Sequence, residues 1–306
     1  MPLRALVRAG VAAALATGLA ACASAPRVPR TPSLAVRVDA VLGAVAGRDR
    51  LVAVAYRDLA TGETLLRNAR ASLHAASTMK VPVMVALFAA AGRGELRLDE
   101  PVAIRNEFAS LVDGSPYQLD PKDDSDPDLY AAIGQTRPLQ ELVGRMIGKS
   151  SNLATNLLLA KIGAAQVTAA MRALDAYDVQ VLRGVEDGKA YAAGLNNTVT
   201  AYDLMIVLRA LAEGRAASPA ASVRMIHILE GQEFNEKIPA GLPPGVRVAH
   251  KTGDITGIHH DAAIVYPPGG SPYVLVVLTA GFQEEREAND AIAAVSRAVW
   301  EARTER

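Results

Sequence analysis

The 306-residue sequence contains only one cysteine, one tryptophan and four phenylalanines. A single cysteine excludes an intramolecular disulfide as a source of stability. Because aromatic side chains are scarce, the hydrophobic core must consist mainly of alanine, leucine, valine and isoleucine. Half of the residues are hydrophobic, and the length is ample for the core of one large domain or of two intertwined domains.

Several patterns with known functions are also absent. Basic and acidic residues number 32 each, and this balance gives no indication of a nucleic-acid partner. There is no His-Glu-x-x-His sequence, and His259-His260 has no evident third ligand, so a metal hydrolase is not expected. The absence of Gly-x-Ser-x-Gly argues against an α/β-hydrolase. We therefore expect no metal and no cofactor.

Residues 1–21 have the pattern of a signal peptide. Arg4 and Arg8 precede an apolar stretch that is too short to span a bilayer. It ends in Leu19-Ala20-Ala21-Cys22, which resembles the lipobox of bacterial lipoproteins. We expect cleavage before Cys22, lipid on its sulfur, and a tether over 22–33. The protein would be exported and lipid-anchored to a bacterial membrane, facing the periplasm or the cell exterior. Alternatively, Cys22 is incidental after an ordinary signal peptide.

The rest of the chain has strand-like ends and a helical middle. Apolar periodicity predicts a first helix over 34–46 and strands over 51–56, 64–67, 246–252, 262–266 and 273–279, followed by a closing helix. The middle predicts helices over 77–92, 138–147, 151–162, 166–174, 200–213 and 219–230. A sheet built from both chain ends (34–74 and 232–306) would then carry an inserted helical domain (75–231), with the active site at the seam.

Residues 112–130 form an acidic, proline-containing segment that interrupts the helical pattern. Its aspartates, among them Asp123, Asp124 and Asp126, raise the possibility of a calcium site. The glycine and glutamate of an EF-hand are missing at the required spacing, so a solvated surface loop is expected.

Ser77-Thr78-Met79-Lys80 is the first of three short polar motifs. A serine hydroxyl is a poor nucleophile until a base takes its proton. If Ser77 opens a helix, Lys80 lies one turn further on the same face, within reach of that hydroxyl. Alternatively, Ser77 is only a helix cap and Lys80 is solvated. The apolar run over 81–88 predicts a mostly buried helix, however, and a lysine at its start needs a partner.

Ser150-Ser151-Asn152 is the second motif, at a predicted transition from loop to helix. The Ser150 hydroxyl could relay a proton to a leaving nitrogen, and the Asn152 amide could hold a substrate carbonyl. The simpler explanation is that these residues only cap the helix, which is plausible for either serine and less so for all three residues together.

Lys251-Thr252-Gly253 is the third motif, at the end of a predicted strand. Lys251 and Thr252 could bind a carboxylate there, and Gly253 would let a substrate backbone approach the strand edge. A turn with a surface lysine is the alternative. Each motif alone is weak evidence, but the three in this order and at long separations favour an acyl-transfer enzyme.

The set of motifs resembles that of the serine β-lactamase and penicillin-binding protein superfamily, and the chain is most similar to class A β-lactamases over roughly residues 34–303. The resemblance implies a β-lactamase/transpeptidase-like fold of the class α/β plus all-α, with an antiparallel sheet flanked by helices. It also implies roles: Ser77 as nucleophile, Lys80 as proton acceptor, Ser150 as proton relay, Asn152 as substrate-positioning amide, Lys251 and Thr252 as carboxylate site, and the backbone N–H groups of Ser77 and Asp254 as oxyanion hole.

Glu186 lies 36 residues after Ser150, a spacing similar to that of the deacylating glutamate of class A enzymes. The resemblance implies that it activates water; alternatively it is an exposed loop acid. The chain departs from the family pattern at three positions. Ser151 replaces a structural aspartate, Ala190 replaces an asparagine that helps to hold the water, and His260 falls where an arginine commonly pairs with the substrate carboxylate.

We therefore expect a monomeric serine hydrolase that opens the β-lactam ring through a Ser77 acyl-enzyme, which Glu186-activated water then hydrolyses. The substrate would be a β-lactam or a peptidoglycan-like small molecule. Two alternatives remain open: a D-Ala-D-Ala peptidase or esterase of the same fold, and a penicillin-binding lipoprotein that is acylated once without turnover. Glu186 favours turnover, whereas the missing asparagine at Ala190 favours a persistent acyl-enzyme.

Overall fold

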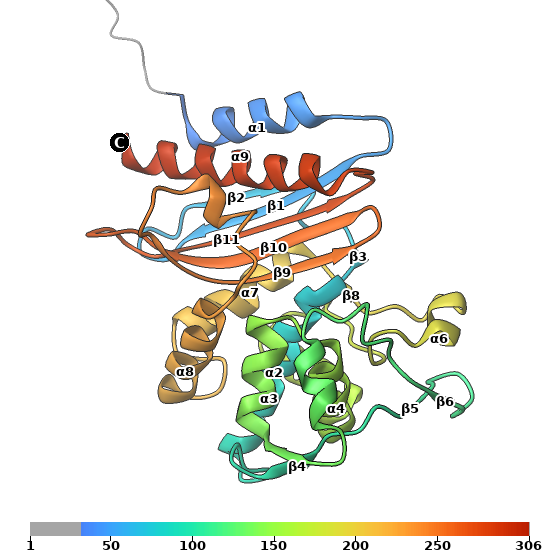
Figure 1. The fold of residues 1–306 in the computed structure, drawn as a ribbon. Helices are drawn as coiled ribbons and strands as arrows, with labels where there is room; N and C mark the ends of the chain where they lie inside the picture. Colours follow the sequence, from blue (N-terminus) through green and yellow to red (C-terminus); the bar gives the residue numbers. More distant parts are fainter. Residues whose placement is uncertain (1–31, 306) are drawn as a thin grey trace, which may run out of the picture. The chain divides into compact units, whose positions relative to one another are not determined.

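A five-stranded antiparallel sheet joins the two ends of the chain in the computed structural model, which describes residues 32–305 (Figure 1). The strand order is β2-β1-β11-β10-β9. The strands are β1 (Leu51–Asp58), β2 (Thr64–Arg67), β9 (Arg247–Ile255), β10 (Ile258–Tyr266) and β11 (Tyr273–Ala280). Leu51 of β1 pairs with Ala280 of β11, so the N-terminal hairpin is continuous with the C-terminal strands. This confirms the predicted sheet from both chain ends.

Helices cover both faces of this sheet. On one face, α1 (Leu34–Val45) packs beside α9 (Glu285–Thr304). On the other face, α7 (Ala201–Ala212) contacts β1, β10 and β11. Strands covered on both faces are buried at successive residues instead of alternate ones, and β10 and β11 show this pattern. The apolar side chains on the two faces therefore belong to two separate core clusters.

The helical region lies against the α7 side of the sheet (Figure 1). Its helices are α2 (Lys80–Gly92), α3 (Leu139–Gly148), α4 (Asn152–Ile162), α5 (Ala164–Arg172) and α8 (Pro219–Glu230). Ten of the thirteen residues of α2 are buried, because α3, α4, α5 and α8 surround it. A helix that is apolar all round is a core helix. Lys80, at its first position, is thereby placed inside the protein.

Short elements connect these parts. They are β3 (Leu73–His74), η1 (Ala76–Met79), β4 (Pro101–Ala103), β5 (Phe108–Ala109), β6 (Pro116–Tyr117), η2 (Pro127–Ala132), β7 (Thr136–Pro138), α6 (Gly188–Ala192), β8 (Thr198–Val199) and η3 (Pro239–Gly241). Pro32–Arg306 forms one compact unit, so the proposed boundaries at 75 and 231 stay predictions. The predicted signal peptide, Cys22 and most of the predicted tether lie outside the described residues.

The acidic segment over 112–130 differs from the expected solvated loop. Asp124 is 6% exposed and Asp126 is fully buried. Asp126 pairs with Arg145 on α3 through both of its oxygens, at 2.9 Å each. Burial of these two carboxylates requires such partners, and the loop is consequently fixed against α3 and α4. Among residues 32–305, no group of three or more histidine, cysteine, aspartate or glutamate side chains is arranged to hold a metal ion.

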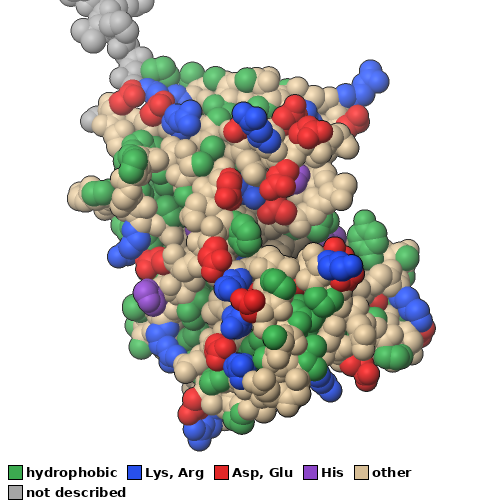
Figure 2. Space-filling view, viewed as in Figure 1, with side chains coloured by type: hydrophobic (Ala, Val, Ile, Leu, Met, Phe, Trp, Pro, Cys, Tyr) green, Lys and Arg blue, Asp and Glu red, His purple; other side chains and the backbone are tan. Residues whose placement is uncertain are grey.

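The surface is mixed in charge. Basic and acidic side chains are interspersed over the face shown in Figure 2, and no broad area of one sign is visible on it. Within the described range, no single helix is long and apolar enough to cross a membrane. The bent pair α4–α5 meets the length and composition requirement, but most of α4 is buried in the core.

Candidate active site

Ser77 lies in the η1 turn, directly before the buried helix α2. Ala76, the residue before it, has a φ of +43°, which is uncommon for a side chain with a Cβ. Its N–H donates to Nδ1 of His74 at 3.1 Å. Ser150 and Glu186 also have positive φ values, +58° and +61°. Three of the five described non-glycine residues with positive φ therefore gather around Ser77, as strained backbone commonly does at functional sites.

Lys80 is fully buried, and its ammonium group is completely hydrogen-bonded. Nζ donates to the Ser150 carbonyl at 2.6 Å, to Ser150 Oγ at 3.1 Å and to Asn152 Oδ1 at 2.9 Å. An ammonium group has three protons, so none remains for Ser77. Burial lowers the pKa of Lys80 to about 7, although Asp124 and Glu186 act in the opposite direction. At neutral pH a substantial fraction of Lys80 is therefore a free amine, able to accept a proton.

Ser150 lies between two buried lysines. Its Oγ accepts hydrogen bonds from Lys80 at 3.1 Å and from Lys251 at 3.0 Å. Burial is the main cause that lowers the pKa of Lys251, and the nearby Lys80 charge lowers it further. Because the oxygen already accepts twice, the Ser150 hydrogen is left to be donated elsewhere. This arrangement suits a hydroxyl that passes a proton to a leaving group and takes one back from a lysine.

Gly253 brings the end of β9 against the nucleophile. A Cβ at this position would lie 3.0 Å from the backbone nitrogens of both Ser77 and Thr78. This is closer than nine in ten Cβ contacts in proteins, so a larger residue here would require the neighbouring backbone to shift by a few tenths of an ångström. The close approach places the next residue, Asp254, beside Ser77, where both line the same cavities. The structure thus brings Lys251, Thr252, Gly253 and Asp254 to the predicted site.

Asn152 connects Lys80 to Glu186. Its Oδ1 accepts from Lys80, and its Nδ2 donates to Glu186 Oε1 at 2.8 Å. Partial desolvation of the Glu186 carboxyl raises its pKa, which the hydrogen bond from Asn152 opposes. Glu186 lines the same cavity as Ser77. A carboxylate in this position can take a proton from a water molecule next to Ser77.

Asn156 holds the loop that carries Glu186, although it belongs to none of the three motifs. Its Oδ1 accepts from the Val185 N–H at 2.7 Å and its Nδ2 donates to the Val185 carbonyl at 3.0 Å. The Tyr117 hydroxyl donates to the same carbonyl at 3.3 Å. A Cβ on Gly184 would lie 2.6 Å from Asn156 Oδ1, so the loop is tightly fitted against α4. In the sequence, only its position indicated a role for Asn156: it lies one turn after Asn152 on the same face of a predicted helix.

Asp124 supplies a carboxylate at the start of α4. Its oxygens accept from the N–H groups of Asn152 at 3.1 Å and Leu153 at 2.8 Å. The N-terminus of a helix favours negative charge because its N–H groups have no partner within the helix. Ser151 is the N-cap, and its Oγ accepts from Ala154 N–H at 3.2 Å. Position 151 lacks the aspartate of the family pattern, but the Asp124 carboxylate from the acidic loop lies at the start of the same helix.

The carboxylate of Asp187, next to Glu186, is bound to the loop backbone and not to Ser77. It caps α6 by accepting from Ala190 N–H at 3.1 Å, and it also accepts from Ser110 Oγ and Leu111 N–H at 2.9 and 2.8 Å. Removing its charge would therefore loosen the loop. Ala190 is fully buried and has no polar side-chain atom with which to hold a water.

His260 is not brought into the site. It pairs with Gly253 across β9 and β10, yet its ring is fully buried. Its Nδ1 lies 2.8 Å from the His259 carbonyl oxygen, and its Nε2 lies 3.0 Å from the His74 carbonyl oxygen. Burial lowers the pKa of His260 to about 4, so the ring is neutral at physiological pH. The predicted pairing of His260 with a substrate carboxylate therefore has no basis in this geometry.

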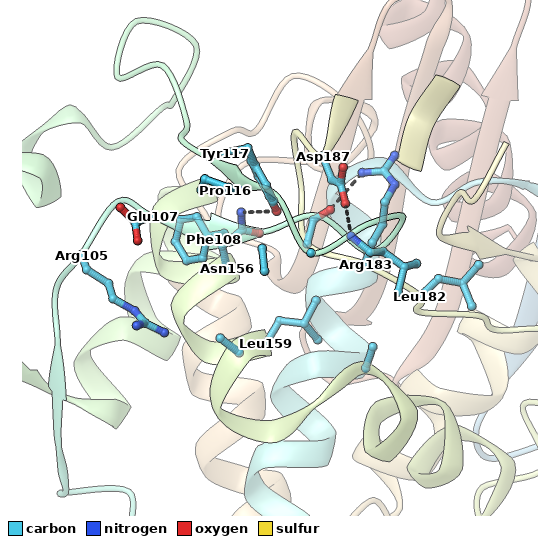
Figure 3. A pocket seen from close by; sticks show the side chains of 16 residues that line it. Arg105, Glu107, Phe108, Pro116, Tyr117, Asn156, Leu159, Leu182, Arg183 and Asp187 are labelled. Atoms are coloured by element: carbon cyan, nitrogen blue, oxygen red, sulfur yellow. Dashed lines mark hydrogen bonds between the residues drawn. The ribbon is translucent and has the colours of Figure 1, made fainter. Parts of the chain in front are cut away.

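Two cavities meet at Ser77. One, of about 370 Å³, is lined by Glu186, Tyr191 and Ile255, and the other, of about 250 Å³, by Ser150, Thr252 and Gly253. Ser77, Asn152 and Asp254 line both. A larger cavity of about 640 Å³ lies between the β5–β6 hairpin, α4 and residues 182–187 (Figure 3). None of the catalytic candidates lines it, so the two smaller cavities are the candidate active site.

Comparisons with known proteins agree with this arrangement. The sequence is 28% identical to the carbapenem-hydrolyzing β-lactamase KPC of Klebsiella oxytoca, over 82% of this chain and 83% of that protein. The structure resembles an ancestral class A β-lactamase of Gram-negative bacteria, with a TM-score of 0.75 and 28% identity over 88% of this chain and all of the other. It also resembles the penicillin-binding protein PBP-A, with a TM-score of 0.76 and 25% identity over 91% and 99% of the two chains.

The sequence model of the β-lactamase enzyme family matches residues 33–302. This range includes the sheet, the helical region and all three motifs around Ser77. The fold predicted from the motifs is confirmed by these structural neighbours. On this evidence the chain belongs to the β-lactamase enzyme family, with class A-like architecture.

Proposed function

We propose that this protein hydrolyses β-lactams by covalent catalysis at Ser77. The observation that carries the proposal is the continuous hydrogen-bonded path from Glu186 through Asn152, Lys80 and Ser150 to Lys251, which passes beside Ser77. Each side chain on this path is either a proton carrier or a group that orients one. Such a path suits a reaction in which a proton is removed, delivered to a leaving nitrogen and then removed again from water.

In the acylation step, the free amine of Lys80 takes the proton of the Ser77 hydroxyl. Ser77 Oγ then bonds to the lactam carbonyl carbon, and the resulting oxyanion accepts from the N–H groups of Ser77 and Asp254. The lactam C–N bond breaks as Ser150 gives its proton to the nitrogen. Lys80 or Lys251 returns a proton to Ser150, which both contact.

In the deacylation step, Glu186 takes a proton from water. The water oxygen attacks the ester carbonyl, and the bond to Ser77 Oγ breaks as that oxygen receives the proton that Glu186 took, so both groups return to their starting states. Asn152 holds Glu186 at 2.8 Å, and Asn156 fixes the backbone of the preceding residue, Val185. These contacts support a base with a constant position relative to Ser77.

Hydrolysis of a chromogenic cephalosporin by the purified protein tests this proposal, together with intact-mass detection of an adduct. The wild type should hydrolyse the compound, and peptide mapping should place the transient adduct on Ser77. Ser77→Ala should lower the rate by a factor on the order of 10³ or more and should form no adduct. Hydrolysis by Ser77→Ala at the wild-type rate would refute the assignment.

A second candidate is a penicillin-binding protein that is acylated and turns over slowly. Two observations favour it: Ala190 offers no side-chain group for the water, and the fold is similar to PBP-A. A peptidase or esterase on a peptidoglycan-like substrate would use the same nucleophile and relay. A stable penicillin adduct on wild-type Ser77, with no released product, would select this second candidate.

A further inference from the structure

The cavity on the Ser150 side of Ser77 is lined by three carboxylates. Asp123, Asp254 and Glu285 face the same space as Ser77, Ser150 and Thr252. No lysine, arginine or histidine is among the described residues that line it. Lys80 and Lys251 lie beneath this surface with no exposed area, and both donate to Ser150. The surface that a substrate meets on this side is therefore acidic.

Asp254 is held rigidly in this cavity. Its Oδ2 accepts from Lys237 Nζ at 3.0 Å, and its Oδ1 lies 2.9 Å from His259 Nδ1. The Lys237 side chain is only 2% exposed, whereas that of Asp254 is 36% exposed. The Lys237 ammonium group is therefore buried in the protein, and the Asp254 carboxylate lies between it and the cavity. Each of its oxygens has a further lone pair with which to accept from a ligand.

Asp123 and Glu285 have no such compensation. Both residues are exposed, and neither forms an ion pair with a described side chain. Lys237 pairs with one of the three carboxylates, and Lys80 and Lys251 lie beneath Ser150 instead of at the cavity surface, so the exposed wall of the cavity keeps an excess of negative charge. The position where the resemblance predicted an additional cation, His260, is buried and uncharged. A group that carries positive charge would be attracted to this cavity, and a second anionic group would be repelled.

We propose that Asp254, with Asp123 and Glu285, selects β-lactams that carry a permanent cation on the ring side, the part that contains the lactam nitrogen and stays attached to the acyl group after the ring opens. This inference rests on the proposed function, because it assumes that Ser77 is acylated. The inference concerns only the group on the ring side of the substrate. It does not depend on whether the acyl-enzyme is hydrolysed quickly or persists. Asp254 is the central residue because it is the one fixed in place and next to the nucleophile.

The test uses two cephalosporins with the same aminothiazolyl methoxyimino side chain. Cefepime carries an N-methylpyrrolidinium group at the C3 methylene, and cefotaxime carries a neutral acetoxy group there. The acylation rate constant for each is measured by intact mass at low ionic strength. The wild type should prefer the cationic compound, and Asp254→Asn, Asp123→Asn and Glu285→Gln should each lower the ratio of the two rates roughly two- to threefold.

Asp178→Asn is the matched control, since Asp178 is an exposed carboxylate that lines neither cavity. It should leave the ratio unchanged. High salt should bring the wild-type ratio closer to that of the variants, because exposed charges are screened. Equal ratios in the wild type and in the exposed-site variants Asp123→Asn and Glu285→Gln would overturn the inference, with the proposed function intact. A wild type that both compounds fail to acylate would overturn the proposed function, and this inference with it.

Discussion

The chemistry proposed for Ser77 depends on a lysine, Lys80, that is buried in the protein without substrate. Lys80 is placed at the first position of a helix that is apolar all round, so the packing of α2 itself keeps water from the amine. Three fixed acceptors orient its protons, and desolvation lowers its pKa to about 7. The Lys80 amine therefore has a fixed orientation, and it exchanges its proton near physiological pH.

Acylation should consequently depend on pH through Lys80. The reactive form is the neutral amine, whose fraction rises with pH and saturates above the pKa. The rate constant for acylation by a penicillin should rise up to about tenfold per pH unit below the Lys80 pKa of about 7 and level off above it. Rapid-quench intact-mass measurements from mildly acidic to mildly alkaline pH would show this profile. A flat profile across neutral pH would exclude Lys80 as the base that activates Ser77.

Gly253→Ala tests the close approach of β9 to the nucleophile. The added Cβ would lie 3.0 Å from two backbone nitrogens, so β9 and the η1 turn must separate by a few tenths of an ångström. The oxyanion donors would then be misplaced, and acylation should slow about ten- to hundredfold. Gly144→Ala is the control, because nothing lies within 4 Å of its Cβ. Unchanged acylation in Gly253→Ala would show that the strand end has room to move.

At the scale of elements, the site is made by contacts between segments that are far apart in the chain. The loop with Glu186 is fixed by α4 through Asn156, and the start of α4 is fixed by Asp124 from the acidic loop. Each contact is a buried polar group satisfied by a segment distant in sequence. These contacts decide where Glu186 lies relative to Ser77.

Asn156→Ala should therefore affect deacylation more than acylation. It removes both hydrogen bonds to Val185, which should lower the free energy of unfolding by about 1–3 kcal/mol and let the loop shift. The penicillin adduct should persist longer than in the wild type while its rate of formation changes little. Tyr117→Phe removes two longer bonds of 3.3 Å, the one to the Val185 carbonyl and the one accepted from Asn156 Nδ2, and should have a smaller effect. Equal slowing of both steps would mean that Asn156 supports the whole site.

The sequence allowed the meeting of Ser77, Ser150 and Lys251 at one site to be predicted, because each belongs to a short motif with local spacing. It did not allow the roles of Asp124 or Asn156 to be predicted, because these depend on contacts between segments that are distant in the chain. Burial of Asp124 and Asp126 was missed for the same reason: their partners lie on other elements. His260 was placed by register alone, which fixes the strand partner but not whether the ring is accessible.

On the scale of the whole molecule, the sheet from both chain ends and the inserted helices meet at the site, so the fold and the chemistry depend on the same contacts. We further propose that the protein is an exported, lipid-anchored monomer facing the periplasm or the cell exterior. This proposal rests on Leu19-Ala20-Ala21-Cys22 after a short apolar stretch.

Cys22→Ser should abolish the lipid anchor. A diacylglycerol on the cysteine sulfur buries many methylene groups, and further chains make the attachment stable. The variant should appear as soluble protein or as an unprocessed precursor, whereas the wild type should be found in the membrane fraction with the mass of the lipid. Wild-type protein recovered without lipid and cut at another site would contradict the proposal.

The central claim is that Glu186 releases the product from Ser77, and intact-mass measurements after mixing with a penicillin test it most directly. Glu186→Gln keeps the size of the side chain and a hydrogen bond to Asn152, but it cannot take a proton from water. General bases contribute about 10²–10⁴-fold, so Ser77 should still be acylated and the adduct should accumulate in the variant. In the wild type the adduct should be transient. An equally persistent adduct in both proteins would contradict the account and leave Glu186 as a loop acid.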